Sequence, residues 1–346
     1  MRFIVYFLIL TPLDSHAAGA CRQLFSSYTP HEYQTTTDVQ IISSGGLKSE
    51  AIEISRDTIK SINSDIGQSI KKPKTVRLEI EKQGENAEFN WGDKIIFPFQ
   101  FFINGKPKHP KFAQTVLAHE YGHYIFSVNL RESVKKYAEY EIQAKMMIDS
   151  HSEVRKRSDD YENAVLDLSK ARKEGNEDKV AELRKKVEST EEYFDRASES
   201  LDQLNVEVKD SVFTRISILS YHELFADIIA VLHVNQPTAM SDALSSSNTK
   251  DASEKFANYS RSFLNRIRLN GWNKNEPHIL FAPVRRIVWE YILSNPKYNQ
   301  NREIMLKEIL FCITEEIRLR IDEKKFSLSP EEMNRRLIDS LMSRFP

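Results

Sequence analysis

The sequence predicts an α+β fold that is predominantly helical, with a small sheet and an inserted antiparallel helical hairpin. Glycine is scarce, whereas glutamate, lysine and arginine, which favour helices, are plentiful. Residues 76–103 contain two short segments with the apolar pattern of strands. A charged stretch, 131–210, repeats apolar residues at steps of three and four, as paired helices do. The 346 residues suffice for one large domain or two ordinary ones.

The composition is that of a globular protein and argues against nucleic-acid binding. Hydrophobic residues make up 40% of the chain and charged residues 29%, which is ordinary for a soluble domain. The formal net charge is −1, and basic runs such as 71–74 are short. A nucleic-acid surface needs a basic excess or a concentrated basic stripe, so we expect none.

Residues 1–20 are expected to be a signal peptide. Arg2 gives a positive start, residues 3–10 form an apolar run, and residues 18–20 supply the small side chains that signal peptidase accepts. The run is too short to cross a bilayer, which needs roughly 20 apolar residues. The alternative is a buried N-terminal strand. We expect an exported protein, periplasmic or secreted, with no transmembrane span in the mature chain.

The two cysteines, Cys21 and Cys312, are too few for a disulfide framework or a cysteine-based zinc site. In an exported protein they can pair with each other. Cys21 would also be the first residue after cleavage, where a bacterial lipoprotein carries its lipid. Position 18 is alanine, not the large aliphatic residue usual before such a cysteine, so lipid anchoring through Cys21 is the less favoured alternative.

Residues 21–130 are expected to form an N-terminal lobe. Its first part, 21–45, is polar and rich in turn-forming residues. Residues 47–70 have the apolar spacing of a helix, which Pro73 ends. Residues 76–81 alternate apolar and charged side chains, which predicts a half-buried strand.

The second half of this lobe leads into the main motif. Residues 94–103 are rich in phenylalanine and isoleucine and predict a second extended segment. A turn is expected at 104–107, and Pro110 suits the first turn of the next helix. That helix, about 110–128, carries the sequence HEYGH.

Residues 131–210 are expected to form the helical hairpin, with a break at 174–178. The second half steps by three and four alternately, as a heptad seam does, at Val180, Leu183, Val187, Thr190, Phe194, Ala197, Leu201 and Leu204. The first half follows the same stepping at Met147, His151, Val154, Ser158, Tyr161, Val165 and Leu168. His151 is expected to pack in this seam rather than to bind a metal.

Residues 211–346 are expected to form a helical lobe. It opens with an unusually apolar helix, 212–234, and a serine-rich loop is expected at 241–249. The remainder is predicted to be helical. Ser329 and Glu332 have the spacing of a capping box at the start of the last helix.

His119, Glu120 and His123, within HEYGH, predict a metal centre. Histidines four residues apart project from one face of a helix, because one turn takes about 3.6 residues. Two imidazole nitrogens in this arrangement can hold one zinc ion. Glu120 lies one step round the helix, where it can act as a base toward water without binding the metal. The alternative is a surface helix with two incidental histidines.

Glu223 is expected to be the third ligand. A catalytic zinc needs a third protein ligand and one open position. Positions 126 and 129 are Phe and Asn, so the glycine and third histidine of the metzincin pattern are missing. Glu139 and Glu141 lie in a charged stretch where carboxylates are common. Glu223 instead lies in a nearly apolar helix, where an unpaired carboxylate would be costly.

Asp227 lies four residues after Glu223, on the same helical face. It is expected to accept the second ring N–H of a ligating histidine and so fix its tautomer. The alternative explanation for two acids in this helix is a buried salt bridge to Arg215 or Arg285.

HEYGH and the later segment 221–227, YHELFAD, resemble the motifs of the gluzincins, the thermolysin-like zinc peptidases with a HExxH helix and a later ExxxD helix. The Glu-x-x-Ala-Asp form is similar to the CAAX-protease group and its soluble periplasmic relatives. The match covers these two helices only. It implies a zincin-like catalytic core: a helix-rich lobe below the zinc, and a small sheet whose edge, here near Lys94–Ile103, holds an extended substrate.

The same resemblance implies one Zn²⁺ ion and hydrolysis of peptide bonds. The chain departs from the family in the long hairpin between the two motifs, and it lacks the membrane helices of the integral members.

The segment Pro277–Arg285 offers candidates for stabilising the oxyanion that develops during hydrolysis. Gluzincins commonly bring a His, Tyr or Arg to this oxygen, and the CAAX-protease group has a downstream His-Pro…Arg element with different spacing. By this analogy His278 is expected to be the catalytic donor. Arg285 would support it, as a second donor or as the partner of Asp227. The alternative is that His278 is a capping or core histidine.

These observations predict a zinc-dependent peptidase that acts on proteins or peptides outside the cytoplasm. The alternative is a non-catalytic binding protein, stabilised by zinc, whose helical hairpin docks a protein partner. Glu120 favours the enzyme, because a structural zinc needs no base beside its ligands.

Overall fold

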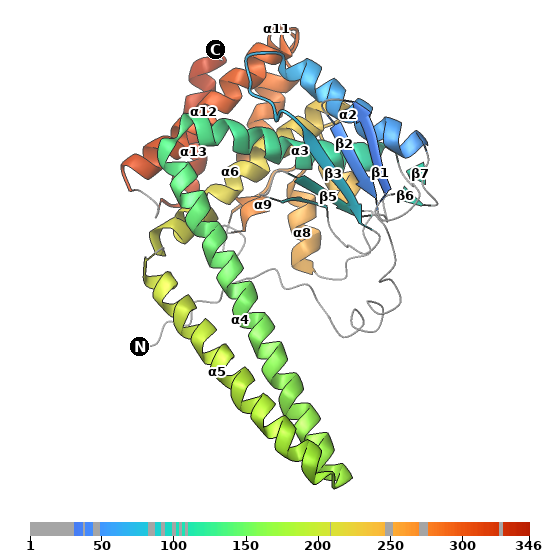
Figure 1. Cartoon of the computed structure of the whole chain (residues 1–346). Coiled ribbons are helices and arrows are strands. Elements are labelled where there is room, and N and C mark those ends of the chain that lie inside the picture. The colour runs from blue at the N-terminus through green and yellow to red at the C-terminus, as the bar shows by residue number, and fades with distance from the viewer. Residues whose placement is uncertain are drawn as a thin grey trace. The chain divides into compact units, whose positions relative to one another are not determined.

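The computed structural model of the chain is α+β and predominantly helical, as predicted (Figure 1). It describes residues 31–36, 39–43, 49–81, 87–90, 94–98, 102–103, 106–107, 110–207, 209–245, 252–269, 276–324 and 328–346. The predicted signal peptide, its cleavage site and Cys21 lie outside these residues, and so does one partner of the predicted disulfide. Cys312 is fully buried.

The chain divides into two units. The first, Met1–Glu53 and Thr75–Lys108, contains the strands, and the second, Ile54–Lys74 and His109–Pro346, contains nearly all the helices. Helix α2 (Ser49–Ile66) begins in the first unit and continues in the second. The HEYGH helix belongs to the second unit, whereas the sequence analysis grouped it with the strands.

A mixed sheet organises the first unit. Its strands are β1 (His31–Thr36), β2 (Val39–Ser43), β3 (Val76–Glu81), β4 (Glu88–Asn90) and β5 (Lys94–Pro98). They lie in the order β1-β2-β3-β5-β4; β2, β3 and β5 are parallel, and each outer strand is antiparallel to its neighbour. A second ladder pairs β6 (Phe102–Ile103) with β7 (Lys106–Pro107).

The predicted alternation of β3 is confirmed. Leu78 and Ile80 are buried, and Glu79 on the opposite face pairs with Lys94 of β5 (2.5 Å). One face of β3 is therefore apolar and the other charged, as the period of two requires.

Strands β1 and β2 lie within residues 21–45, for which the sequence predicted no strand, only a polar segment rich in turn-forming residues. Val39 and Ile41 are fully buried because β2 lies between β1 and β3 in the sheet. A strand of five residues is too short for its alternation to stand out from a polar neighbourhood.

Twelve helices are described in the second unit besides α2. They are α3 (Pro110–Ser133), α4 (Lys135–Glu174), α5 (Glu177–Glu207), α6 (Lys209–Val234), α7 (Ala239–Ser245), α8 (Ala252–Ser260), α9 (Pro277–Leu280), α10 (Ala282–Ile287), the π-helix η3 (Val288–Leu293), α11 (Pro296–Asn299), α12 (Arg302–Asp322) and α13 (Pro330–Arg344). The loop predicted at 241–249 is wrong as far as Ser245, because Met240 and Ala243 give α7 a buried face. The predicted cap is confirmed: the Ser329 hydroxyl accepts from the Glu332 amide (3.1 Å).

The packing of α3 on α6 forms the centre of the second unit. Both helices are buried around much of their circumference. Gly122 permits their close approach: a Cβ atom there would lie 2.8 Å from Ala226 Cα, nearer than carbon atoms approach each other.

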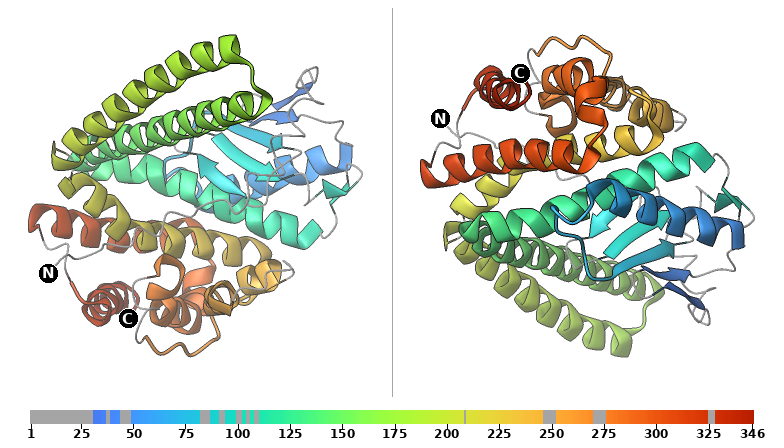
Figure 2. Two further views of the ribbon diagram at one scale, coloured as in Figure 1. Left: turned by 90° about the horizontal axis from the view of Figure 1, so that it is seen from below. Right: turned by 90° about the horizontal axis from the view of Figure 1, so that it is seen from above.

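Helices α4 and α5 form the predicted antiparallel hairpin. Figure 1 shows them running side by side, and Figure 2 shows the same pair from two further directions. Leu168 and Leu183, on either side of the turn, share one apolar cluster, and Val154 packs with Leu201 further along. Gly175 makes the turn with φ of 69°, the left-handed conformation in which glycine is favoured.

The prediction that Val165 lies in the interface between α4 and α5 is wrong. Val165 is 39% exposed, whereas its neighbour Ala164 is fully buried. A small residue fits between two closely packed helices, so burial follows position in the interface rather than hydrophobicity. The side chains of Met147 and His151 lie outside the described ones. None of the described helices combines the length and apolar character needed to cross a membrane.

Candidate metal centre

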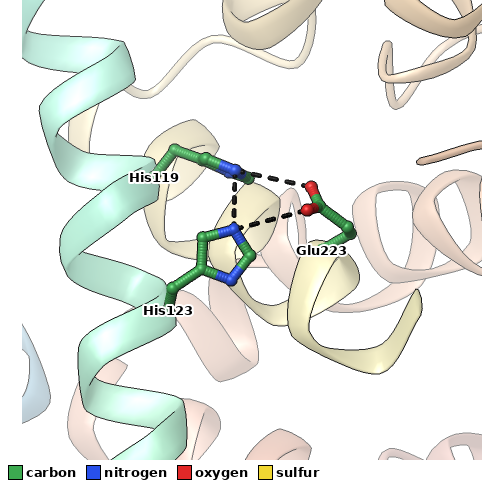
Figure 3. A group of neighbouring side chains, drawn as sticks. All are labelled: His119, His123 and Glu223. Atoms are coloured by element: carbon green, nitrogen blue, oxygen red, sulfur yellow. Dashed lines mark hydrogen bonds and ion pairs between the residues drawn. The ribbon is translucent and has the colours of Figure 1, made fainter. Parts of the chain in front are cut away.

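Helices α3 and α6 bring His119, His123 and Glu223 together (Figure 3). The ligand atoms of the three side chains all lie within 4.8 Å of one another. The two Nε2 atoms of the histidines are 3.0 Å apart, and each lies 3.5 Å from a different oxygen of Glu223. All three residues are buried. His119, His123 and Glu223 therefore form a candidate ligand group that can hold a metal ion.

The donor set fits a metal better than it fits an ordinary hydrogen-bond network. Buried Glu223 Oε2 accepts no hydrogen bond from the described residues, although the guanidinium of Arg261 lies 3.2 Å away as an ion-pair partner. Leaving a buried charged acceptor without a hydrogen bond is costly, and coordination of a metal ion would reduce that cost. Two imidazole nitrogens with one carboxylate oxygen are donors that metal sites commonly combine.

Glu120 is also buried, but it is not part of the ligand group. It follows His119 directly in α3, so its side chain leaves the helix about 100° away from the face that His119 and His123 share. Tyr121, within the same motif, donates to Asn63 (2.7 Å) and is engaged elsewhere.

Asp227 lies directly behind His119. Its Oδ1 atom is 3.0 Å from His119 Nδ1, the ring nitrogen on the side away from Glu223. Arg285 donates through Nε to Asp227 Oδ2 (2.7 Å), so the buried salt bridge weighed as an alternative is also present. The side chain of Arg215, the other candidate partner, lies outside the described ones. Asp227 therefore contacts both a ligand histidine and a guanidinium.

His278 reaches the centre from the start of α9. Its Nε2 atom is 3.5 Å from Glu223 Oε1, and its Nδ1 is 2.5 Å from Glu276. Burial would lower the pKa of His278, but the carboxylates of Glu223 and Glu276 raise it to about 10. Burial likewise opposes ionisation of Glu223, yet the positive charge of His278, followed by smaller contributions from other groups, holds its pKa well below the usual range. The two side chains therefore favour each other's charged forms.

Arg285 supports this segment through the backbone. Its Nη1 donates to the carbonyl oxygen of His278 (2.9 Å), while Nε is held by Asp227. The sequence predicts two alternative roles for Arg285, a second donor or the partner of Asp227. The described contacts are those of a partner of Asp227.

Arg261, just after α8, is a residue of the centre that the sequence analysis missed. Its guanidinium donates to Asp227 and also lies 3.2 Å from Glu223 and 2.9 Å from His119 Nε2. The chain has 49 lysines and arginines, and no spacing relates Arg261 to either motif. Glu276 is one of 50 aspartates and glutamates, and no spacing relates it to either motif, so the sequence did not predict it either.

The two ligand histidines have pKa values shifted in opposite directions. Burial is the largest effect on each ring and favours its neutral form. At His123 burial prevails and lowers the pKa to about 3. At His119 burial and the charge of Arg261 also lower the pKa, but contacts with Asp227 and Glu223 outweigh them and raise it. The lowered pKa of His123 favours the neutral ring that binds a metal, whereas the raised pKa of His119 makes that neutral form harder to reach.

The remaining candidates lie away from the ligand group. His222 Nε2 is 3.1 Å from the Tyr137 hydroxyl, and the His222 ring packs edge to face on Phe126, as expected for a residue facing elsewhere on α6. Glu139 is exposed on α4, and the side chain of Glu141 lies outside the described ones.

The sequence matches no protein-family model, no curated protein and no solved structure.

Proposed function

We propose that this chain is a zinc-dependent peptidase of the gluzincin type, which hydrolyses peptide bonds in proteins or peptides outside the cytoplasm. The observation that carries the proposal is the buried ligand group of His119, His123 and Glu223, with Glu120 beside it on α3. A ligand group alone would serve a structural ion. An additional buried acid next to it favours catalysis, since such an acid can serve as a base.

Zinc is the ion that this donor set favours. Two imidazole nitrogens and one carboxylate oxygen are a ligand set of catalytic zinc sites, which keep a further position open. Calcium and magnesium sites are built from oxygen donors instead. When bound, zinc would lower the pKa of water and polarise a peptide carbonyl group.

The residues of the chain would share the remaining work. Glu120 would accept a proton from the attacking water. The resulting hydroxide would add to the carbonyl carbon, the C–N bond would break, and the amine would leave with the proton that Glu120 took from the water. His278, whose side chain is 30% exposed, is accessible to a substrate and would donate a hydrogen bond to the former carbonyl oxygen. Asp227 would accept a hydrogen bond from His119 Nδ1. This contact would favour the tautomer whose Nε2 atom, on the side of Glu223, carries no proton and can bind the metal.

The hairpin supports a second candidate, a zinc-stabilised binding protein. Helices α4 and α5 pack chiefly on each other, and they leave large apolar side chains exposed at Leu166, Tyr193 and Val206. Exposed apolar groups favour contact with another protein. The hairpin is therefore where we expect a protein partner or substrate to dock, whichever function holds. Glu120 beside the ligand group favours the enzyme.

Export of the protein from the cytoplasm is part of the same proposal, and the sequence of residues 1–20 supports it. The order of positive charge, apolar run and small residues is that of a signal peptide. The mature protein would then be periplasmic or secreted, with lipid anchoring at Cys21 as the less favoured alternative.

Metal analysis combined with a cleavage assay tests the function. The purified protein should contain one zinc per chain and degrade an unfolded protein substrate. Glu120→Gln should keep the zinc and lose hydrolysis, whereas His123→Ala should lose both. Glu139→Gln, which changes an exposed glutamate of α4, is the matched control and should behave like the wild type.

Two results would decide against the peptidase. Zinc binding without hydrolysis in the wild type, over a range of protein substrates, would favour the binding protein. Full activity of Glu120→Gln would remove the base on which the mechanism depends.

A further inference from the structure

Arg261 occupies an unusual position, in direct contact with the ligand group. Its side chain is almost completely buried. Its Nη2 atom lies 2.9 Å from His119 Nε2, 3.0 Å from His119 Nδ1 and 3.2 Å from Glu223 Oε2. His119 Nε2 is the same atom that faces His123 and Glu223. A permanently charged guanidinium therefore contacts two of the three residues that would bind the metal.

The two arginines of the centre have different surroundings. Arg285 donates to Asp227 Oδ2 and to the carbonyl oxygen of His278. Arg261 donates to Asp227 Oδ1, through Nε (3.1 Å) and Nη2 (2.5 Å), and extends past it to the ligands. Asp227 thus has a second guanidinium partner if Arg261 moves, whereas Glu223 would lose the contact with its Oε2 atom.

Buried acids explain why a cation is needed at this point. Asp227 is fully buried and Glu223 nearly so, and a buried carboxylate is stable only when paired. Arg261 supplies positive charge to both carboxylates. A divalent ion bound by His119, His123 and Glu223 would supply the same charge from within the ligand group.

The two cations interfere with each other. An ion bound to His119 Nε2 at about 2.1 Å would lie within about 5 Å of Arg261 Nη2, since that nitrogen is itself 2.9 Å from Nε2. Like charges at this separation repel, and burial strengthens the repulsion because little water screens it. Arg261 also competes for the electron pairs of Glu223 that a metal would use.

We propose that Arg261 is a built-in counter-ion of the metal-free centre, which withdraws from His119 and Glu223 when a metal ion binds. Arg261 then stabilises the metal-free protein and weakens its affinity for the metal. The residues that follow it, 262–269, form neither helix nor strand, so its withdrawal need not disrupt a regular element. The inference rests on metal binding, which the proposed function also requires, and not on peptidase activity.

Arginine labelling of the wild-type protein tests the withdrawal directly. Phenylglyoxal modification, mapped by mass spectrometry, is compared with and without zinc. Arg261 should react slowly in the metal-free protein and several-fold faster after zinc is added. Arg285, fully buried behind Asp227, should stay slow in both states, and exposed Arg266 should react fast in both. Slow, unchanged labelling of Arg261 in protein that has bound zinc would overturn the inference.

Zinc affinity of variants provides the second test. Affinity is measured by competition with a chromophoric chelator for Arg261→Gln, with Arg266→Gln as control. Removing the positive charge should tighten zinc binding by at least about tenfold and lower the melting temperature of the metal-free form. Arg261→Lys should lie between Arg261→Gln and the wild type. Unchanged or weaker affinity in Arg261→Gln would overturn the inference and leave Arg261 as a structural support.

The outcomes of these experiments distinguish failure of the proposed function from failure of the inference about Arg261. If the wild type binds no zinc, the proposed function falls and this inference falls with it. If zinc binds but neither labelling nor affinity responds to Arg261, only the inference falls.

Discussion

Gly122→Ala should damage the metal centre without touching a ligand. The added methyl carbon would lie 2.8 Å from Ala226 Cα and 3.2 Å from Ile229 Cβ. Carbon atoms prefer separations of about 3.5–4.0 Å, so α3 and α6 must separate locally by roughly 0.7 Å. Metal sites tolerate ligand displacements of only about 0.2 Å. His123, the next residue, would therefore move relative to Glu223 by more than the site allows.

The expected magnitudes for Gly122→Ala follow from two opposing effects. Overpacking costs about 1–3 kcal/mol, whereas replacing a helical glycine by alanine contributes about 1 kcal/mol in the other direction. The free energy of unfolding of the metal-free protein should fall by about 0–2 kcal/mol. Zinc affinity should fall by about 10–100-fold, as when groups that position metal ligands are disturbed.

Gly175→Ala is the matched control. It adds the same methyl group, but a Cβ there would meet no atom within 4 Å. The left-handed backbone of Gly175 makes the substitution cost roughly 1–2 kcal/mol of stability. Its zinc affinity should equal that of the wild type. Chemical denaturation and zinc competition, measured on both variants, separate the two quantities. Wild-type zinc affinity in Gly122→Ala would show that the α3–α6 spacing does not set the ligand positions.

Four further predictions test other parts of the molecule. His278→Ala should lower turnover by about 10²–10³-fold at unchanged zinc content; intact turnover, or unfolding, would make His278 a structural residue. Replacing residues 147–204 by a short Gly/Ser link should leave zinc binding intact by metal analysis, because the hairpin packs chiefly on itself; global unfolding would contradict this. The Glu303 carboxylate accepts from the Ser69 hydroxyl (2.6 Å) and from the Ser69 amide (2.7 Å), and these hydrogen bonds lower its pKa from 4.5. Its stabilising effect is then present above that pH and lost in acid, so Glu303→Gln should lower the melting temperature at pH 7 more than at low pH. Intact-mass analysis should show a mature chain that begins at Cys21; a retained Met1 would contradict export, and a lipid increment would show an anchor.

Local sequence patterns predicted the residues whose positions depend on one helix. His119 and His123 share a face because of their spacing, and Glu223 stood out because its helix is otherwise apolar. Asp227 followed from the same helical period. In each case the relevant geometry extends over one turn, which the sequence specifies without knowledge of the fold.

Residues brought to the centre by tertiary packing could not be predicted in this way. Arg261 and Glu276 lie at the two ends of the connection between α8 and α9. The contact of Arg261 with Asp227 spans many residues of sequence, and that of Glu276 with His278 depends on how α9 begins. The burial of β2 depends likewise on its neighbours in the sheet. In the hairpin interface Ala164 is buried and the predicted Val165 is exposed, because the separation of the helices, not hydrophobicity, determines which side chain fits there.

Asp227 can have two roles, to orient His119 as a metal ligand and to balance the charges of Arg261 and Arg285, and its surroundings determine which variants distinguish them. This carboxylate contacts His119 and two guanidiniums, those of Arg261 and Arg285, with no exposure to water. Its removal would leave two buried positive charges with less compensation, at a cost of about 3–5 kcal/mol for each broken pair. Loss of zinc in Asp227→Ala would then follow from either role. Glu223→Gln is the better test, because it keeps the shape of the side chain and changes a charge that faces the ligand atoms. If it abolishes zinc binding while the protein without zinc stays folded, Glu223 is needed for metal binding and not for folding.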